Sequence, residues 1–265
     1  MSNYRLIALD VDGTLITDDH QITARTKETI RTVCEAGAQI VLCTGRGPLS
    51  TLPILAELGL TGTVITHNGA ATIHSANRTV MNQFAFRIEE VARIIHYCKQ
   101  HDIQFDANAA YELYVEQISE EAREMYRKYF ADPIEVGDIL SLTEPIVKLS
   151  ICAEGAVLDK LTEDWPHIGN PKLRMIRSGE FFIDVMHPEA NKGNALAQLA
   201  GELGIAASEV LAIGNYFNDI EMITFAGMGI AMDNSPEGVK ASADAMTASN
   251  NEEGVSEALI RYCLT

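Results

Sequence analysis

Two aspartates near the start of the chain, Asp10 and Asp12, follow a short apolar segment and are separated by a single residue. Gly13 comes directly after them and lets the backbone turn at once, so both carboxylates can face one pocket. A carboxylate placed in this way can act as a nucleophile while its neighbour acts as general acid and base. Aspartate is also common in turns, so the pair taken alone fits an ordinary capped loop equally well.

Two further segments carry groups that bind anions. Thr44, Gly45 and Arg46 offer a hydroxyl, an unhindered backbone amide and a guanidinium in succession. Lys192, followed by Gly193 at a predicted helix start, adds an ammonium group and the positive end of a helix dipole. A solvated surface lysine is the simpler explanation of Lys192 if it is considered alone.

A segment near the C-terminal end, residues 214–219, contains Asn215, Asn218 and Asp219. Carboxylate and amide oxygens of this kind are ligands that hard cations accept. The same residues could instead cap a helix. The sequence therefore contains one potential nucleophile, two potential anion sites and one potential cation site.

Each of these segments follows, or lies close to, an element that could hold it in place. Continuous apolar runs are typical of strands that are covered on both faces, and longer segments with helical spacing, 23–36 and 191–203, lie between them. The predicted fold class is α/β with a doubly wound parallel sheet. The predicted strands cover residues 5–9, 39–43, 63–66, 210–213 and 228–232.

Polar residues follow the carboxyl ends of these strands, including His67 and Asn68 after the third. In an open α/β sheet the ligand crevice lies outside that edge. We therefore expect the polar segments to converge there. His67 could contact a substrate or make a structural hydrogen bond, and Arg46 could hold a substrate or balance nearby acids. Asn68 is a further candidate for contact with the substrate.

The middle of the chain has a different pattern, with polar and apolar residues alternating at 112–116 and 181–186. Such alternation is typical of an antiparallel sheet with one covered face. We interpret residues 84–187 as an inserted α+β domain, and residues 1–83 with 188–265 as the core. One larger mixed sheet is the alternative.

Composition limits the kind of ligand. The chain has 37 acidic and 20 basic residues, and its net charge of −17 disfavours nucleic acid and anionic membrane surfaces as partners. No apolar run approaches the ~20 residues of a membrane span. Five cysteines without a C-x-x-C pair fit reduced thiols, which predicts a cytoplasmic protein. A small-molecule ligand is favoured, and nothing in the sequence indicates an oligomeric state.

Taken together and in this order, the four motifs resemble the haloacid dehalogenase-like (HAD) superfamily of phosphatases. The similarity is greatest to the Cof-type branch, whose larger class IIB cap is inserted between the second and third motifs. It includes the sequence THNGA at residues 66–70 and the C-terminal segments at 231–236 and 247–255. The resemblance spans the whole chain, although the predicted cap has almost no motif of its own.

The resemblance implies a role for most of the candidate residues. Asp10 would be the nucleophile that forms an aspartyl phosphate, and Asp12 would protonate the leaving oxygen and then activate water. Mg²⁺ would bind the Asp10 carboxylate and the backbone carbonyl of Asp12, with Asn215 and Asp219 completing its shell. The phosphate would be held by Val11 (through its backbone), Thr44, Gly45, Lys192 and Asn218.

Asn215 departs from the family pattern, which usually has aspartate at this position. Asparagine keeps the shape and one oxygen but lacks the negative charge that Mg²⁺ prefers. Three explanations remain open: a variant that relies on Asp219, a protein weakened into a binder, or an engineered substitution. The leading hypothesis is a Mg²⁺-dependent phosphomonoesterase of small phosphorylated metabolites, such as sugar phosphates or phosphorylated cofactors. The alternative is a phosphorylated-metabolite binding protein with weak or lost turnover.

Overall fold

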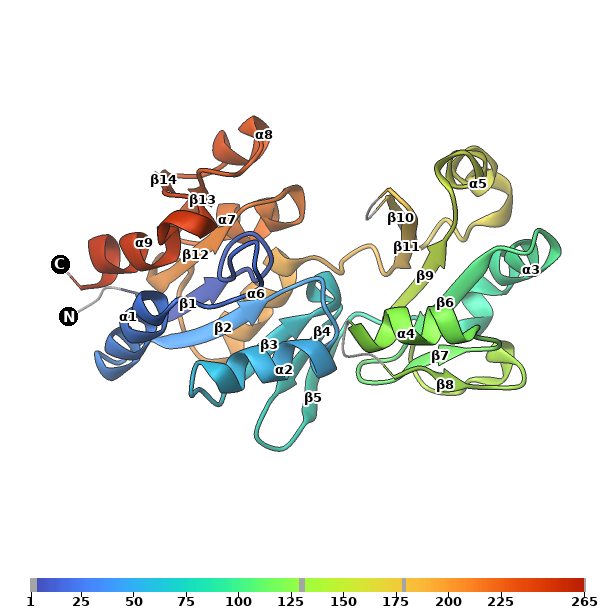
Figure 1. Cartoon of the computed structure of the whole chain (residues 1–265), viewed down its shortest axis with the longest axis horizontal. Helices are drawn as coiled ribbons and strands as arrows, with labels where there is room; N and C mark the ends of the chain where they lie inside the picture. Colours follow the sequence, from blue (N-terminus) through green and yellow to red (C-terminus); the bar gives the residue numbers. More distant parts are fainter. Residues whose placement is uncertain (1–3, 129–131, 178–179, 265) are drawn as a thin grey trace. The chain divides into compact units, whose positions relative to one another are not determined.

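The computed structural model describes residues 4–128, 132–177 and 180–264. The chain divides into two compact units (Figure 1). The first combines Met1–Asn82 with Asn191–Thr265, and the second is the continuous segment Gln83–Ala190. The sequence interpretation placed the divisions after residues 83 and 187.

The first unit contains an eight-stranded sheet in the part of the chain that the structure describes, in the order β14-β13-β12-β1-β2-β3-β4-β5. Parallel pairing runs from β14 to β3, and β4 is antiparallel to β3. The predicted α/β class is confirmed, but the sheet is mixed rather than parallel throughout, because β4 is antiparallel to β3. Strands β4 and β5 were not predicted. The strands are β1 (Leu6–Leu9), β2 (Gln39–Cys43), β3 (Thr63–Thr66), β4 (Ala71–His74), β5 (Thr79–Gln83), β12 (Val210–Gly214), β13 (Met228–Met232) and β14 (Ala245–Thr247).

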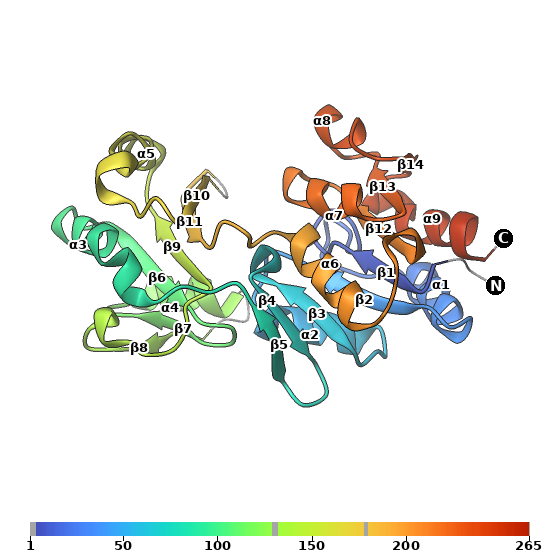
Figure 2. The same cartoon turned by 180° about the vertical axis from the view of Figure 1, so that it is seen from behind.

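Helices cover both faces of this sheet, as expected of a doubly wound fold. Helices α6 and α7 pack together on the face turned to the viewer in Figure 2, whereas α1 and α2 lie on the face turned to the viewer in Figure 1. Helix α9 packs against α1. The helices are α1 (Ala24–Glu35), α2 (Pro48–Glu57), α6 (Lys192–Glu202), α7 (Ile220–Phe225), α8 (Glu237–Lys240) and α9 (Gly254–Cys263).

The neighbouring strands β1 and β12 lie inside the sheet and are buried along their whole length, which their apolar residues and glycine allow. Hydrogen-bonding side chains mark where the flanking helices start. Thr23 caps α1 by accepting from the backbone N–H of Thr26, and Asn191 caps α6 by accepting from the N–H of Asn194 at 2.7 Å. Both caps stabilise the first turn of the helix that they begin.

The second unit contains a six-stranded sheet among the described residues, in the order β10-β11-β9-β6-β7-β8. Its pairs are antiparallel except for β7 with β8. One face carries Phe105, Ile151 and Ile183, which share an apolar core with Ile95 of α3 and Leu161 of α5. The elements are β6 (Gln104–Asn108), β7 (Leu113–Val115), β8 (Ile134–Glu135), β9 (Lys148–Cys152), β10 (Arg174–Arg177), β11 (Phe182–Met186), α3 (Ala92–Gln100), α4 (Glu120–Lys128) and α5 (Gly155–Ile168).

Over the described ranges, no helix is both long and apolar enough to cross a membrane.

Candidate active site

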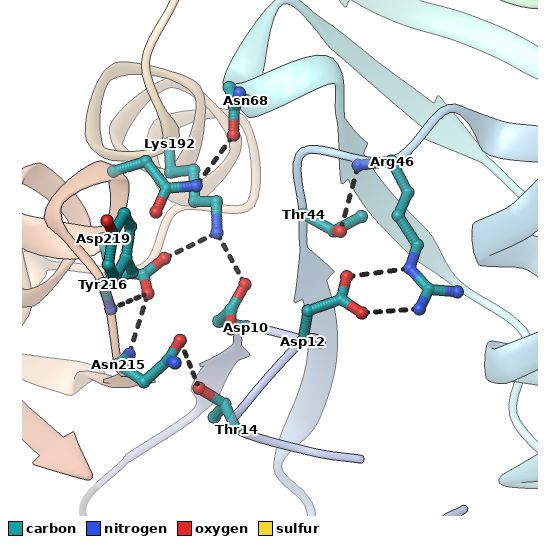
Figure 3. A network of polar contacts seen from close by, with 11 residues as sticks. Asp10, Asp12, Thr14, Thr44, Arg46, Asn68, Lys192, Asn215, Tyr216 and Asp219 are labelled. Atoms are coloured by element: carbon teal, nitrogen blue, oxygen red, sulfur yellow. Dashed lines mark hydrogen bonds and ion pairs between the residues drawn. The ribbon is translucent and has the colours of Figure 1, made fainter. Parts of the chain in front are cut away.

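The candidate residues of the first unit gather at the carboxyl ends of its parallel strands (Figure 3). Asp10 follows β1, Thr44 follows β2, Asn68 lies just past β3, and Asn215 follows β12. Parallel strands place these ends at one edge, so segments more than 200 residues apart come together: the Thr14 hydroxyl lies 3.3 Å from the Asn215 amide.

A fully buried lysine is at the centre of the site. Lys192 has no exposed surface, and its Nζ lies 2.7 Å from Asp10 Oδ1 and 2.5 Å from Asp219 Oδ1. Both carboxylates are buried as well, at 4% exposure for Asp10 and 0% for Asp219. Breaking such a pair is costly, because an unpaired charge would then be left away from water. The simple surface role of Lys192 is thus ruled out.

The electrostatics of this triad follow from burial and charge. Burial and the nearby charge of Asp219 raise the pKa of Asp10 to about 7, while the ammonium of Lys192 acts in the opposite direction. Burial favours the neutral amine of Lys192, but the two carboxylates outweigh it and raise its pKa. The lysine therefore stays charged, and additional positive charge near Asp10 would favour its ionised, nucleophilic form.

Asp219 is committed to the protein itself. Its Oδ1 bonds to Lys192, and its Oδ2 accepts the backbone N–H groups of Asn215 at 2.8 Å and Tyr216 at 3.0 Å. These bonds close the turn after β12. Gly214 makes the closure possible, because a Cβ there would lie 2.5 Å from Cβ of Asp219. The geometry favours Asp219 as the residue that positions Lys192 and this turn, rather than as the direct metal ligand suggested by its sequence position.

Asp12 is paired with Arg46. The guanidinium Nε lies 2.8 Å from Asp12 Oδ2 and Nη2 lies 2.5 Å from Oδ1, a two-point contact (Figure 3). The Asp12 side chain is 51% exposed and that of Arg46 25%. Thr44 supports the arginine, since its hydroxyl oxygen accepts from the backbone N–H of Arg46 at 3.1 Å. Of the two roles proposed for Arg46, balancing a nearby acid has a contact in the structure.

Asn68, Asn218 and Gly45 form a second group. The amide of Asn218 donates to Asn68 Oδ1 at 2.9 Å, and a Cβ on Gly45 would lie 3.0 Å from the same oxygen. His67 is buried at 4% exposure, and a Cβ on Gly47 would lie 3.2 Å from its ring. The structure therefore brings Asn68 and Asn218 together, whereas His67 packs below the surface.

The backbone of residues 11–14 forms the other wall of the site. The Val11 side chain is fully buried, and its carbonyl accepts from the backbone N–H groups of Leu15 and Ile16 at 3.0 and 3.1 Å. Gly13 has a φ of +76°, and a Cβ there would lie 2.3 Å from the side-chain nitrogen of Asn215. Glycine is therefore required both by the turn and by the close approach of Asn215.

The Asn215 amide completes a cluster of oxygens. The Asn215 amide ends in an oxygen and a nitrogen, and one of these two positions faces Asp10. The atom in that position lies 3.1 Å from Asp10 Oδ2, 3.0 Å from the backbone oxygen of Asp12 and 3.3 Å from Thr14 Oγ1. Adjacent ligands of an octahedral Mg²⁺ with bonds of 2.0–2.1 Å are separated by about 2.9 Å. With the amide oxygen facing the cluster, its distances to the Asp10 carboxylate and to the Asp12 carbonyl are thus close to those between adjacent Mg²⁺ ligands.

This donor set has little charge. In the described part of the chain, no three Asp, Glu, His or Cys side chains are placed together as a metal site. The oxygens around Asn215 instead come from one carboxylate, one backbone carbonyl and one amide. The residues therefore fit a hard cation through geometry, with one negative charge among the direct donors.

The second unit contains a polar group that was not predicted from the sequence. Asp106, Ser150 and Asp184 are buried on the face of the sheet opposite the apolar core. Ser150 donates to Asp184 Oδ1 at 2.9 Å, and Tyr126 donates to Asp106 Oδ2 at 2.8 Å. Burial raises the pKa of Asp106. The sequence contains a pattern that indicates this polar face, since polar residues alternate with apolar ones in β6, β9 and β11.

Comparison with known proteins agrees with this arrangement. A model of haloacid dehalogenase-like hydrolases matches residues 7–259, nearly the whole chain. The chain belongs to this haloacid dehalogenase-like hydrolase family. The match includes the ends of β1, β2 and β12 and the start of α6, where the site is built.

Individual relatives align with this haloacid dehalogenase-like protein over almost its whole length. YxeH of Bacillus subtilis is 32% identical over 97% of both chains. The 5-amino-6-(5-phospho-D-ribitylamino)uracil phosphatase YcsE of the same organism is 28% identical, over 98% of this chain and 96% of its own. A haloacid dehalogenase-like hydrolase from Bacteroides thetaiotaomicron has a similar crystal structure, with a TM-score of 0.88 at 29% identity over 97% of this chain and 99% of that one. The protein is a phosphatase of the haloacid dehalogenase-like family.

Proposed function

We propose that the protein hydrolyses small phosphate monoesters with the help of Mg²⁺, through a phosphorylated Asp10. The observation that carries this proposal is the placement of the Asp10 carboxylate. One of its oxygens is held by Lys192 at 2.7 Å, and the other faces the oxygen cluster around Asn215. A buried carboxylate between two cationic positions can approach a phosphate dianion that would otherwise repel it.

Asp12 is the general acid and base of this proposal. It would protonate the leaving oxygen of the ester and later take a proton from the attacking water. Its two-point contact with Arg46 holds the ionised carboxylate, which is the form that accepts a proton from water. The guanidinium also keeps a full positive charge near the site, which favours binding of an anionic substrate.

The phosphate is held by groups that surround Asp10 without reacting. Lys192 supplies charge, Thr44 supplies a hydroxyl, and Asn218 supplies an amide, while Gly45 and Val11 contribute backbone N–H groups. These donors suit the oxygens of a phosphoryl group. Bound Mg²⁺ would add positive charge at Asp10, the Asp12 carbonyl and Asn215.

The substrate class is inferred from the relatives. YcsE is named for a substrate that carries its phosphate on a ribityl chain. We infer that the substrate is a phosphorylated sugar, sugar alcohol or cofactor, and that the second unit acts as a cap that selects its organic part.

A screen over a panel of phosphorylated metabolites, with Mg²⁺ and with EDTA, tests the activity. We expect release of inorganic phosphate from a subset of sugar or polyol phosphates, and a large loss of rate in EDTA. Equal rates in both conditions would contradict the metal requirement.

Single-turnover measurements distinguish an enzyme from a binder. With enzyme in excess and Mg²⁺ saturating, we expect one equivalent of phosphate to be released from a substrate found in the screen. Unimpaired binding of that compound without any release would instead support a protein that has lost turnover through Asn215.

A further inference from the structure

The side chain of Asn215 can interact in two ways with the neighbouring oxygens of Asp10, Asp12 and Thr14. Its amide presents either an oxygen or an NH₂ group to the same place, and the two orientations differ by a half turn about the last side-chain bond. Such a terminal torsion is broad, so both orientations are accessible to the side chain. The aspartate usual in this family has no donor to offer.

With the nitrogen toward the cluster, the two N–H groups of the amide have three acceptors within reach. These are Asp10 Oδ2 at 3.1 Å, the backbone oxygen of Asp12 at 3.0 Å and Thr14 Oγ1 at 3.3 Å. The first two acceptors are the atoms proposed to bind Mg²⁺. With the oxygen toward the cluster, the hydroxyl of Thr14 donates to Asn215 instead, and the oxygens of Asp10, Asp12 and Asn215 face one another.

Each orientation of the amide fits a different state of the site, one with Mg²⁺ bound and one without. Oxygens about 3 Å apart repel unless a proton or a metal cation lies between them, whereas an NH₂ group satisfies the same acceptors without either. The backbone of Asn215 is held in both cases, because its N–H is bound to Asp219. The exchange therefore needs only rotation of the amide.

We propose that Asn215 is a two-state metal ligand, whose oxygen joins the Mg²⁺ shell and whose NH₂ group replaces the ion when none is bound. The inference rests on the proposed function for the position of the metal. It explains why this chain can dispense with a carboxylate: the metal-free site is already paired. The protein gives up metal affinity, because Mg²⁺ must displace hydrogen bonds rather than relieve repulsion.

Two substitutions separate the two states. Asn215→Asp removes the donor and adds a charged oxygen ligand, whereas Asn215→Leu removes donor and ligand at similar volume. Asn234→Asp is the matched control, since this neighbouring amide donates to the carbonyl of Gly13 at 2.9 Å and not to the cluster. The melting temperature is measured in EDTA and over a series of Mg²⁺ concentrations, and Mg²⁺ binding is followed by calorimetry.

In EDTA, we expect both Asn215 variants to melt below the wild type by on the order of 5 °C, because an acceptor on Asp10 is left unpaired. In Mg²⁺ the variants should diverge. Asn215→Asp should bind the ion at least about tenfold more tightly than the wild type and show the larger stabilisation, and Asn215→Leu should show almost none. Asn234→Asp should respond to Mg²⁺ as the wild type does.

The proposal is overturned if Asn215→Asp is as stable as the wild type in EDTA, or if Asn215→Leu retains the wild-type response to Mg²⁺. Should neither variant fold, the wild type labelled with ¹⁵N-asparagine provides the test. One side-chain NH₂ pair should be slow to exchange in EDTA and should shift and exchange faster on addition of Mg²⁺, and no responsive pair would reject the rotation.

These results are separable from the activity itself. Melting shifts of the expected pattern without turnover of any phosphate ester would reject the proposed function and keep the two-state amide. Turnover without the expected melting shifts would keep the proposed function and reject the two-state amide.

Discussion

Asp10 is the side chain whose replacement should separate binding from turnover. Asp10→Asn keeps the shape of the group, but its amide cannot form an acyl phosphate. We expect the rate of phosphate release to fall at least about 10³-fold, while inorganic phosphate still binds. Steady-state assays and calorimetric titration with phosphate measure the two effects. More than a trace of activity in the variant would show that another group is the nucleophile.

Asp12 should affect the rate through proton transfer. Asp12→Ala removes the carboxylate that Arg46 holds, and we expect the rate to fall by ~10² to 10⁴. The loss should be smaller for a substrate whose leaving group is a stable anion, such as a nitrophenolate, because that oxygen needs less protonation. An equal loss for aliphatic and nitrophenyl esters would argue against a role as general acid.

At the scale of single residues, the sequence predicted which side chains gather but not how they pair. Apolar strands followed by polar segments were enough to place Asp10, Thr44 and Asn215 at one edge. The contact of Arg46 with Asp12 depends on the rotamers of two flexible side chains, which no spacing determines. The two bonds that commit Asp219 to Lys192 and to its own turn depend equally on local geometry.

Among the elements, the start of α6 is held in place by a glycine on another loop. Gly69 has a φ of +92°, and a Cβ there would lie 2.1 Å from the backbone oxygen of Asn191. Gly69→Ala should therefore destabilise the protein by more than about 3 kcal/mol, from strain plus displacement of α6. Since Lys192 begins that helix, the rate should fall roughly 10- to 100-fold.

A matched substitution at Gly59 separates the steric clash with Asn191 from the backbone strain of a positive φ. Gly59 also has a positive φ, +71°, but nothing lies within 4 Å of its Cβ position. Gly59→Ala should cost about 1–2 kcal/mol and leave the rate unchanged. Urea denaturation and phosphate-release assays compare the two variants. Equal costs at both positions would mean that the contact with Asn191 is unimportant.

Element boundaries were predictable where the pattern was strong. The spacing at residues 23–36 and 191–203 corresponds to α1 and α6 with their capping residues, because cap preferences and apolar periodicity agree there. Strands β4 and β5 were missed because they mix small, polar and apolar residues at the edge of the sheet, where β4 is antiparallel to β3. Pairing of that kind depends on the neighbour across the sheet, which a single strand's sequence does not contain.

For the whole molecule, two units with separate sheets should unfold as separate transitions. The second unit has its own apolar core, including Ile95, Leu149 and Val185. We expect differential scanning calorimetry to resolve two overlapping transitions. Mg²⁺ with inorganic phosphate should raise the midpoint of one of them, because the candidate site belongs to the first unit alone. A single transition with equal calorimetric and van't Hoff enthalpies would contradict independent units.

The position of β1 in its sheet affects how the protein is made. β1 pairs with β2 on one side and with β12 on the other, and β12 begins at Val210. At ~5–20 residues per second, a ribosome needs roughly 10 to 40 s to proceed from β1 to the end of β12. The second unit is synthesised completely in that interval and can fold first. Asp10 therefore leaves the ribosome well before Lys192 and Asp219, which complete its native surroundings, have been made.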